Sequence, residues 1–339
     1  YDSAGIATLD NGGIERRRSE GKLDNLAQRI TEEPIAGRTG IGHTRWATHG
    51  VPNEKNAHPH ATDRVALVHN GIIENFQTLR DELEAAGHQL ASDTDTEVVV
   101  HLITLALEQG QAPADAVATV LARLDGAFAL GIIFAGEEDL MIAARRGSPL
   151  AIGIGADDRK GEMYLGSDAI ALAALTSQIL YLEDGDRAVM TSQSVSVYDA
   201  EGAEVTRPIR ESTVTDDAIG KGGYEHFMEK EIYEQPQVIG DTLHSYINPA
   251  AGTVTLPEFS FDPTQASKFT LIACGSSYLA CLLAKYWLES IARVPVEVDI
   301  ASEFRYRGAA MPDGGIAVFV SQSGETADTL AALRYARAQ

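Results

Sequence analysis

The histidines of this 339-residue chain are concentrated in one short segment. A metal centre is the first chemistry to consider there, because imidazole is a common ligand and a His-X-His sequence places two rings on one face of an extended chain. The spacing of the histidines matches no standard metal-binding pattern. No Asp or Glu lies nearby in the sequence at a spacing suited to metal coordination. We therefore expect no metal and no other cofactor. Five of the nine histidines lie in this segment, at His43, His49, His58, His60 and His69.

The same segment carries residues suited to an amino-acid substrate. The guanidinium of Arg45 can bind a carboxylate through two parallel hydrogen bonds, and the amide of Asn70 beside the backbone N–H of Gly71 can hold a developing oxyanion. Asp95 can accept hydrogen bonds from an α-ammonium group. Each residue also has a structural interpretation: a surface or ion-pair arginine, the tip of a hairpin, and the N-cap of a following helix. The combination favours attack on the carbonyl of a bound amino acid.

Two serine-rich loops later in the chain suit a phosphate. CGSSY, from Cys274 to Tyr278, follows an expected strand and opens an expected helix, where backbone N–H groups and hydroxyls favour an anion. SQSGET, from Ser321 to Thr326, repeats this arrangement, and loops at the carboxyl ends of parallel strands can converge on one ligand. The alternative is a pair of serine-rich turns with helix caps. The sequence lacks GxGxxG and GxxxxGK[ST], which argues against a dinucleotide or a nucleoside triphosphate.

The elements that position the first set of residues mix two periodicities. Apolar residues at helical spacing predict amphipathic helices, and a change to short alternating runs then predicts strands at hairpin spacing. Helices followed by many antiparallel strands are typical of an α+β layered domain. The expected helices are 74–87, 96–108 and 114–124, and the expected strands are 126–134, 140–143, 151–154, 162–166, 179–182, 187–190 and 194–198.

A different order of elements follows the polar tract 200–223, which we interpret as a linker. A helix is expected through HFMEKEIYEQP, with Pro236 ending or kinking it. Beyond it, strands and helices alternate, which indicates a parallel sheet. Only about three strands are visible, fewer than such a sheet usually has, so we expect an incomplete fold. The strands are 269–273, 296–300 and 316–320, and the helices are 277–291 and 325–339.

Composition limits the possible partners and setting. The formal charge of −22 repels nucleic acid and anionic membrane surfaces, and no stretch of apolar residues is long enough to span a bilayer. The start of the chain, from Tyr1, has no signal-peptide pattern. With only two cysteines, Cys274 and Cys281, no disulfide framework is possible. We expect a cytoplasmic protein in a reducing setting.

Several motifs together resemble the glutamine–fructose-6-phosphate aminotransferase family, also called glucosamine-6-phosphate synthases. The motifs are GHTRWATHG, NAHPH, VHNGIIEN, SDTDTE, HFMEKEIYEQP, CGSSY, ASEFRYR and SQSGETADT, which cover nearly the whole chain. The resemblance implies an α+β layered N-terminal-nucleophile domain of the glutamine amidotransferase type 2 class over residues 1–213. A linker and connecting helix at 214–260 and an incomplete α/β parallel-sheet SIS (sugar isomerase) domain at 261–339 would follow.

The resemblance also assigns roles in a glutaminase site. It implies that Asn70 and Gly71 form the oxyanion hole and that Trp46 gates the passage of ammonia. Family members begin with a catalytic cysteine, whereas this chain begins with Tyr1. We therefore expect this chain to be unable to hydrolyse glutamine as it stands. The residues implied to bind glutamine are Arg45, Thr48 and His49 at the α-carboxylate and Asp95 at the amino group.

For the second domain, the resemblance implies a sugar-phosphate site without isomerase residues. Those residues belong to a second SIS domain and a C-terminal tail, so we expect neither half-reaction from this chain. The intact enzyme would transfer the amide nitrogen of glutamine to fructose 6-phosphate and pair into homodimers through its SIS domains. Another type of glutamine amidotransferase and a non-catalytic sensor of hexose phosphate or amino acid are the alternatives. The implied sugar-phosphate residues are Ser276, Ser277, Ser321, Gln322, Ser323 and Thr326.

Overall fold

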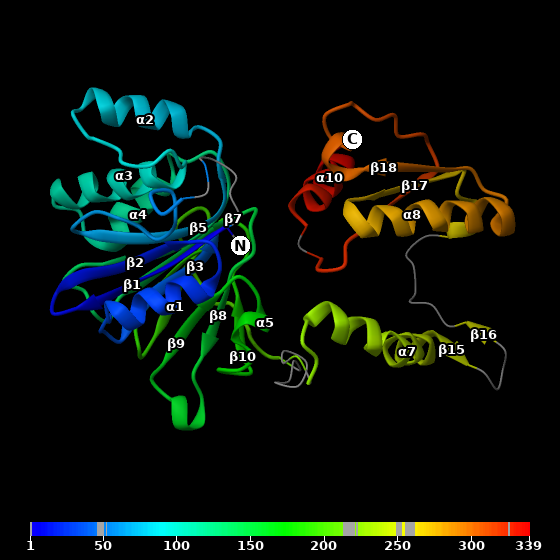
Figure 1. Cartoon of the computed structure of the whole chain (residues 1–339). Helices are drawn as coiled ribbons and strands as arrows, with labels where there is room; N and C mark the ends of the chain where they lie inside the picture. Colours follow the sequence, from blue (N-terminus) through cyan, green and yellow to red (C-terminus); the bar gives the residue numbers. More distant parts are fainter. Residues whose placement is uncertain are drawn as a thin grey trace. The chain divides into compact units, whose positions relative to one another are not determined.

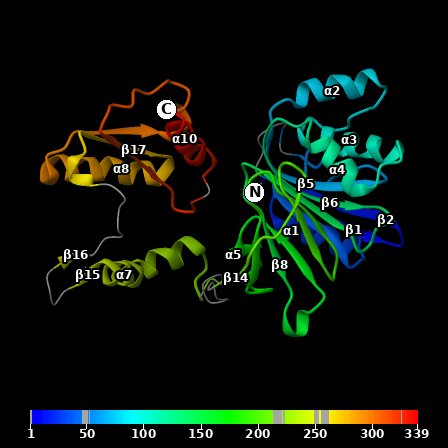
Figure 2. The same cartoon turned by 180° about the vertical axis from the view of Figure 1, so that it is seen from behind.

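The chain divides into two compact units, Tyr1–Gly220 and Lys221–Gln339. The computed structural model describes residues 2–45, 51, 53–212, 221, 223–248, 253–254, 262–324 and 326–339. Figure 1 shows the elements of each unit along the chain, and Figure 2 shows them from behind. Each unit has its own sheets and its own buried core.

The first unit is built around a seven-stranded sheet with the order β13-β12-β11-β7-β6-β5-β4. Its neighbouring strands pair antiparallel throughout. The central strands are rich in Val, Ile, Phe and Leu, as expected for strands that are covered on both faces. The bounds are β4 His60–Ala61, β5 Val65–Ile73, β6 Gly126–Phe134, β7 Met141–Arg146, β11 Arg187–Met190, β12 Val195–Tyr198 and β13 Glu204–Val205.

Helices cover one face of this sheet, and the core between them contains the even-numbered residues of β6. Phe128, Leu130 and Ile132 pack there against the apolar residues of three helices. Because successive side chains of a strand point to opposite faces, the odd-numbered residues face the other way. Figures 1 and 2 both show these helices together on one side of the unit. Their bounds are α2 Phe76–Ala85, α3 Thr96–Glu108 and α4 Pro113–Leu121.

Two smaller sheets lie against the opposite face. Ile133 of β6 packs with Ala7, Leu9 and Ile41 from a three-stranded sheet of order β2-β1-β3. Ala143 of β7 packs with residues of a four-stranded sheet of order β14-β10-β8-β9. The bounds are β1 Ser3–Asp10, β2 Gly13–Glu20, β3 Thr39–Arg45, β8 Ala151–Ile154, β9 Met163–Gly166, β10 Gln178–Tyr181 and β14 Ile209–Glu211, with the helices α1 Leu23–Glu32 and α5 Ala169–Leu172 and a 3-10 turn at Asp157–Arg159.

The second unit contains a short parallel sheet between helices. Its order is β18-β17-β19, and both outer strands run parallel to β17. Ile272 of β17 packs with Phe304 and Ala332 on one face, whereas Leu271 packs with Cys281 on the other. The elements are α7 Phe227–Tyr246, β15 Ile247–Asn248, β16 Thr253–Val254, a 3-10 turn at Pro263–Gln265, β17 Lys268–Ala273, α8 Gly275–Trp287, a π-helical turn at Leu288–Ala292, β18 Val296–Ile300, α9 Ala301–Phe304, β19 Gly315–Val320 and α10 Ala327–Arg337.

One expectation about the middle of the chain is wrong. The polar tract 200–223 is not a linker throughout, because β13 pairs with β12 and β14 pairs with β10. Of the two outcomes expected at Pro236, an end of the helix does not occur, because α7 continues past this residue to Tyr246. Within the residues that the structure describes, no helix is both long and apolar enough to cross a lipid bilayer.

Candidate functional site

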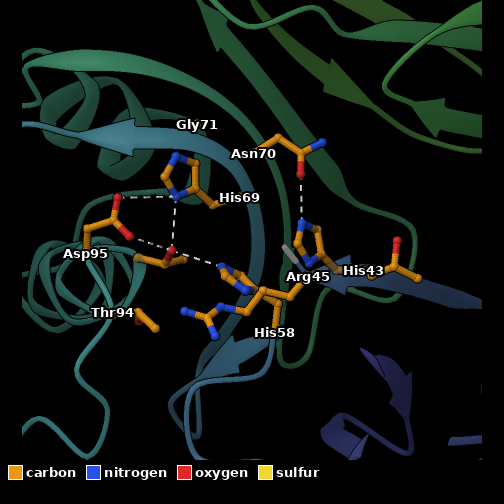
Figure 3. A pocket seen from close by; sticks show the side chains of 10 residues that line it. His43, Arg45, His58, His69, Asn70, Gly71, Thr94 and Asp95 are labelled. Carbon is orange, nitrogen blue, oxygen red and sulfur yellow. Dashed lines mark hydrogen bonds and ion pairs between the residues drawn. The ribbon is translucent and has the colours of Figure 1, made fainter. Parts of the chain in front are cut away.

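A cavity of about 210 Å³ lies where β3 and β5 meet the start of α3. Ligand pockets for drug-sized molecules are roughly 300–1,000 Å³, so this cavity suits a smaller ligand such as an amino acid. Figure 3 shows the side chains around it. The lining residues are His43, Thr44, Arg45, His58, His69, Asn70, Gly71, Thr94, Asp95 and Thr96.

Arg45 is the last residue of β3 and lies at the edge of this cavity. Its exposed fraction is 3%, so it is not the surface arginine of the structural alternative. Asp2 places a carboxylate oxygen 3.9 Å from Arg45 Nη1, at the far limit of ion-pair distance. A charged guanidinium in such a buried place favours an anionic ligand that can accept its hydrogen bonds.

Asp95 lies directly before α3 and is also 3% exposed. Its side chain does not cap the helix. Instead, the backbone N–H of Ile73 donates to Asp95 Oδ2 at 2.9 Å, which ties the carboxylate to β5. His69 Nδ1 lies 3.9 Å from the same oxygen. Asp95 therefore occupies the N-cap position as expected but makes no capping hydrogen bond, and its carboxylate lies at the cavity.

Asn70 and Gly71 are not the tip of a hairpin, because they lie inside β5 opposite Ala129 and Phe128 of β6. Gly71 has a φ of 129°, and a Cβ at this position would lie 2.0 Å from the carbonyl oxygen of Ala127. Only glycine fits such close backbone contact without displacement. The strand thus presents the Asn70 amide and the Gly71 backbone side by side at the cavity.

Histidines and threonines that line the cavity form a hydrogen-bonded group together with His60, which lies behind the lining. His58 Nε2 and His69 Nδ1 each lie 2.9 Å from Thr96 Oγ1, and His60 Nε2 lies 3.0 Å from Thr94 Oγ1. The ring centroids of His58 and His60 are 4.8 Å apart. These imidazoles bond to hydroxyls, and no three His, Cys, Asp or Glu side chains among the described residues are placed to hold a metal.

Burial favours the neutral form of two of these imidazoles. It places the pKa of His58 well below the ordinary value of 6.5 and lowers the pKa of His60 to about 3. For His60, the charges of Arg18, Arg16 and Arg45 act in the same direction, and that of Glu97 opposes them. Several imidazoles can therefore share this small space without like-charge repulsion at neutral pH.

Sequence reasoning found part of this site. Arg45, Asn70, Gly71 and Asp95 are brought together as expected. The threonines at 94 and 96 were missed, and the histidines at 43, 58 and 69 were weighed only as metal ligands. Their close spacing was the available signal, but it did not distinguish metal ligands from imidazoles that bond to hydroxyls. Three predicted site residues lie outside the described residues: Trp46, Thr48 and His49.

In the second unit, the two serine-rich loops lie at the same edge of the sheet. Ala273 at the end of β17 pairs with Val320 at the end of β19, so both loops follow the carboxyl ends of adjacent parallel strands. Ser321 Oγ lies 2.9 Å from Thr326 Oγ1 and accepts a hydrogen bond from the backbone N–H of Gly324. The predicted residues of the first loop are in the first turn of α8, at Ser276 and Ser277.

The hydroxyl of Ser321 thus has partners within its own loop, as the turn interpretation requires. The edge also offers exposed polar side chains, among them Ser276, Gln322 and Ser323. The arrangement suits an anion held by hydroxyls and backbone N–H groups.

Comparison with known proteins agrees with this geometry. Residues 43–175 match the glutamine amidotransferase domain family, and residues 264–339 match the SIS domain family. Glutamine–fructose-6-phosphate aminotransferase (isomerizing) of Zymomonas mobilis is 55% identical over 338 residues, which cover 100% of this chain and 55% of that protein. The protein of the same name from Brucella suis is 56% identical over 339 residues, with the same shares.

The chain is a homologue of the glutamine–fructose-6-phosphate aminotransferases. The resemblance in the motifs is thereby confirmed, with a glutamine amidotransferase domain followed by a SIS domain. The SIS match separates the chain from amidotransferases without such a domain. The chain spans about half the length of these relatives.

A solved structure supports the fold. Glutamine phosphoribosylpyrophosphate amidotransferase from B. subtilis has a TM-score of 0.51 and 20% sequence identity, covering 95% of this chain and 63% of that one. At this identity the likeness concerns the fold alone. It agrees with a layered α+β amidotransferase domain.

Proposed function

We propose that the protein containing this chain transfers the amide nitrogen of glutamine to fructose 6-phosphate, giving glucosamine 6-phosphate and glutamate. The observation that carries the proposal is the meeting of Arg45, Asp95 and the Asn70-Gly71 pair around one small cavity. A zwitterionic amino acid has a carboxylate for the arginine and an ammonium for the aspartate. Its side-chain carbonyl would then lie toward the oxyanion donors.

The glutamine amidotransferase domain would bind glutamine, and the SIS domain would bind the sugar phosphate. Thr48 and His49 would share the α-carboxylate with Arg45, and Trp46 would gate the released ammonia. The resemblance of the motifs around these residues to the family supports these roles. The six hydroxyl and amide residues of the two serine-rich loops would bind the sugar phosphate, namely Ser276, Ser277, Ser321, Gln322, Ser323 and Thr326.

Calorimetric titration of the chain with L-glutamate, the expected product, tests the amino-acid site. We expect Arg45→Ala and Asp95→Ala each to weaken binding at least about 10-fold, because each removes a charged hydrogen-bond partner. Arg38→Ala and Asp63→Ala are matched controls, since both side chains are exposed and neither lines the cavity. Equal affinity of the Arg45 or Asp95 variant and its control would contradict the site.

Titration with fructose 6-phosphate tests the second site. Ser321→Ala should weaken binding, whereas Ser290→Ala, which changes an exposed serine on the π-helical turn, should not. In the full-length protein, binding of both ligands without formation of glucosamine 6-phosphate would favour the sensor alternative.

We further infer that the protein forms a homodimer paired through its SIS domains, and sedimentation equilibrium would measure this. We also infer a reducing cytoplasmic setting, which agrees with the free thiols of Cys274 and Cys281.

A further inference from the structure

His43 is a lining residue of the amidotransferase cavity for which the proposed chemistry has no direct use. It lies on β3, two residues before Arg45, and faces Asn70 across the gap to β5 (Figure 3). His43 Nε2 is 2.7 Å from Asn70 Oδ1. An amide oxygen can only accept a hydrogen bond, so His43 Nε2 carries the hydrogen and donates it.

This hydrogen bond determines which end of the Asn70 side-chain amide is available to a ligand in the cavity. With Oδ1 engaged by His43, the Nδ2 group is the part of the Asn70 side chain left to donate. Rotation of the amide by 180° would break the bond and present the oxygen instead. An oxygen lone pair beside a developing oxyanion would repel it, whereas an N–H group stabilises it. The orientation of Asn70 is therefore as important as its presence.

His43 is poorly placed for proton transfer to a substrate. Its Nε2 is committed to Asn70, and its Nδ1 is buried. The ring packs against His58, with the two centroids 4.5 Å apart. Burial lowers the pKa of His43, and the hydrogen bond to Asn70 opposes this only in part. A neutral imidazole with its hydrogen on Nε2 is the state that fits these surroundings.

We propose that His43 is a positioning residue of the oxyanion hole, holding the Asn70 amide through Nε2–H so that its nitrogen end donates to the reacting carbonyl. The inference rests on the proposed glutaminase function of this cavity. It assigns a role in the reaction to a residue that acts through Asn70.

Glutamine hydrolysis by the full-length protein, with kcat and KM measured separately, tests this role. His43→Phe keeps a ring against His58 but removes the donor. We expect it to lower kcat about 5- to 10-fold, the effect of one lost hydrogen bond, with KM within about 2-fold. His43→Gln places an amide N–H near the position of Nε2 and should retain most of the activity. If His43→Phe does not fold, His43→Leu carries the same expectation.

A double-mutant cycle tests whether His43 acts through Asn70. Asn70→Ala should lower kcat about 100- to 1,000-fold, as for loss of an oxyanion donor, and adding His43→Phe should lower it no further. The matched control is His88→Leu, which changes a histidine that contacts His101 edge to face and does not line the cavity. It should leave kcat unchanged.

Three outcomes would overturn the inference alone: an unchanged kcat in His43→Phe, an equal loss in His43→Phe and His43→Gln, or losses that multiply in the double variant. By contrast, absence of glutamine hydrolysis in the unaltered full-length protein, or an unchanged kcat in Asn70→Ala, would overturn the proposed function of the cavity and the inference with it.

Discussion

At the scale of single residues, the cavity combines charged groups with neutral imidazoles. Arg45 and Asp95 supply opposite charges, and both are almost fully buried. Burial penalises the protonated rings of His43 and His58, which also line the cavity, and it lowers the pKa of both. A ligand in the cavity thus meets one positive and one negative group. Because His43 and His58 are neutral, they add no further positive charge to the electric field of this pair.

The buried histidines should make the stability of this domain sensitive to acid. The unfolded chain binds a proton at His60 near the ordinary pKa of 6.5, whereas the folded chain does so only near a pKa of about 3. Between these values the unfolded state holds more protons, so the free energy of unfolding falls as the pH falls. The contribution of neutral, buried His60 to the free energy of unfolding is complete above pH 6.5 and is lost progressively below it.

We predict that His60→Gln flattens this profile while keeping a hydrogen-bonding group toward Thr94. Between about pH 6 and pH 4.5, the free energy of unfolding should fall less steeply than in the unaltered chain, by up to about 1.4 kcal/mol per pH unit for one titrating group. Denaturant-dependent hydrogen exchange of β6 amides would measure the free energy of unfolding at each pH. His226→Gln, which alters an exposed side chain, is the control. Parallel profiles for the unaltered chain and His60→Gln would contradict the prediction.

Residue chemistry explains why only part of the site could be predicted. Arg45, Asn70, Gly71 and Asp95 have chemical roles that follow from their own functional groups. The role of Thr96 depends instead on its position between two imidazoles that come from distant segments. Nothing in the sequence around Thr96 indicates those partners, so the fold was needed to find them.

At the scale of elements, apolar patterns predict the bounds of helices and strands best where burial in the core determines the structure. The helix at 96–108 and the strand at 126–134 have the expected bounds, because both are covered by the core. The strands of the first 45 residues were not assigned. In β2, the sequence GIERRRSE shows no apolar alternation.

Arginines explain why β2 does not look like a strand. Arg16 donates to the carbonyl of Pro59, Arg17 to that of Glu33, and Arg18 to those of Lys55 and Ala57. Burial lowers the pKa of Arg18 to about 10. These side chains join β2 to loops distant in the sequence, so the strand is stabilised by polar contacts that periodicity does not register.

The close pairing of β5 with β6 leads to a prediction about Gly71. We expect Gly71→Ala to destabilise the domain by about 2–4 kcal/mol, because the new methyl group would collide with backbone and the φ value is unfavourable for alanine. Urea unfolding would measure this loss. Gly87→Ala is the control: it has a similar positive φ but open space around it, and it should cost only about 1 kcal/mol. Equal losses in the two variants would show that crowding at β6 is unimportant.

At the scale of the whole molecule, the net charge of −22 affects stability and ligand binding together. Mutual repulsion among acidic groups opposes the compact state. The proposed phosphate site relies on hydroxyls and backbone N–H groups, and the long-range field of the chain works against an anion there. Salt should therefore influence both properties in the same direction.

We predict that raising the ionic strength from about 0.01 M to 0.5 M increases the melting temperature, because the Debye length shortens from about 30 Å to well below 10 Å and screens the repulsion. Scanning calorimetry in sodium chloride would measure it. The same series with a neutral osmolyte such as sucrose at matched osmolality is the control for non-electrostatic effects. A melting temperature that falls with salt would mean that attractive ion pairs outweigh the net repulsion.

The hydroxyl of Thr96 has one hydrogen but faces ring nitrogens of both His58 and His69 at 2.9 Å. It can donate to only one of them, so at least one imidazole must carry a hydrogen on the nitrogen that faces it. The tautomers of these two rings are therefore correlated, and the pair cannot occupy all four combinations. The hydroxyl of Thr96 therefore restricts which tautomers the two rings can adopt at the same time. Nitrogen-15 spectra of the two rings should accordingly change together when Thr96 is replaced by valine.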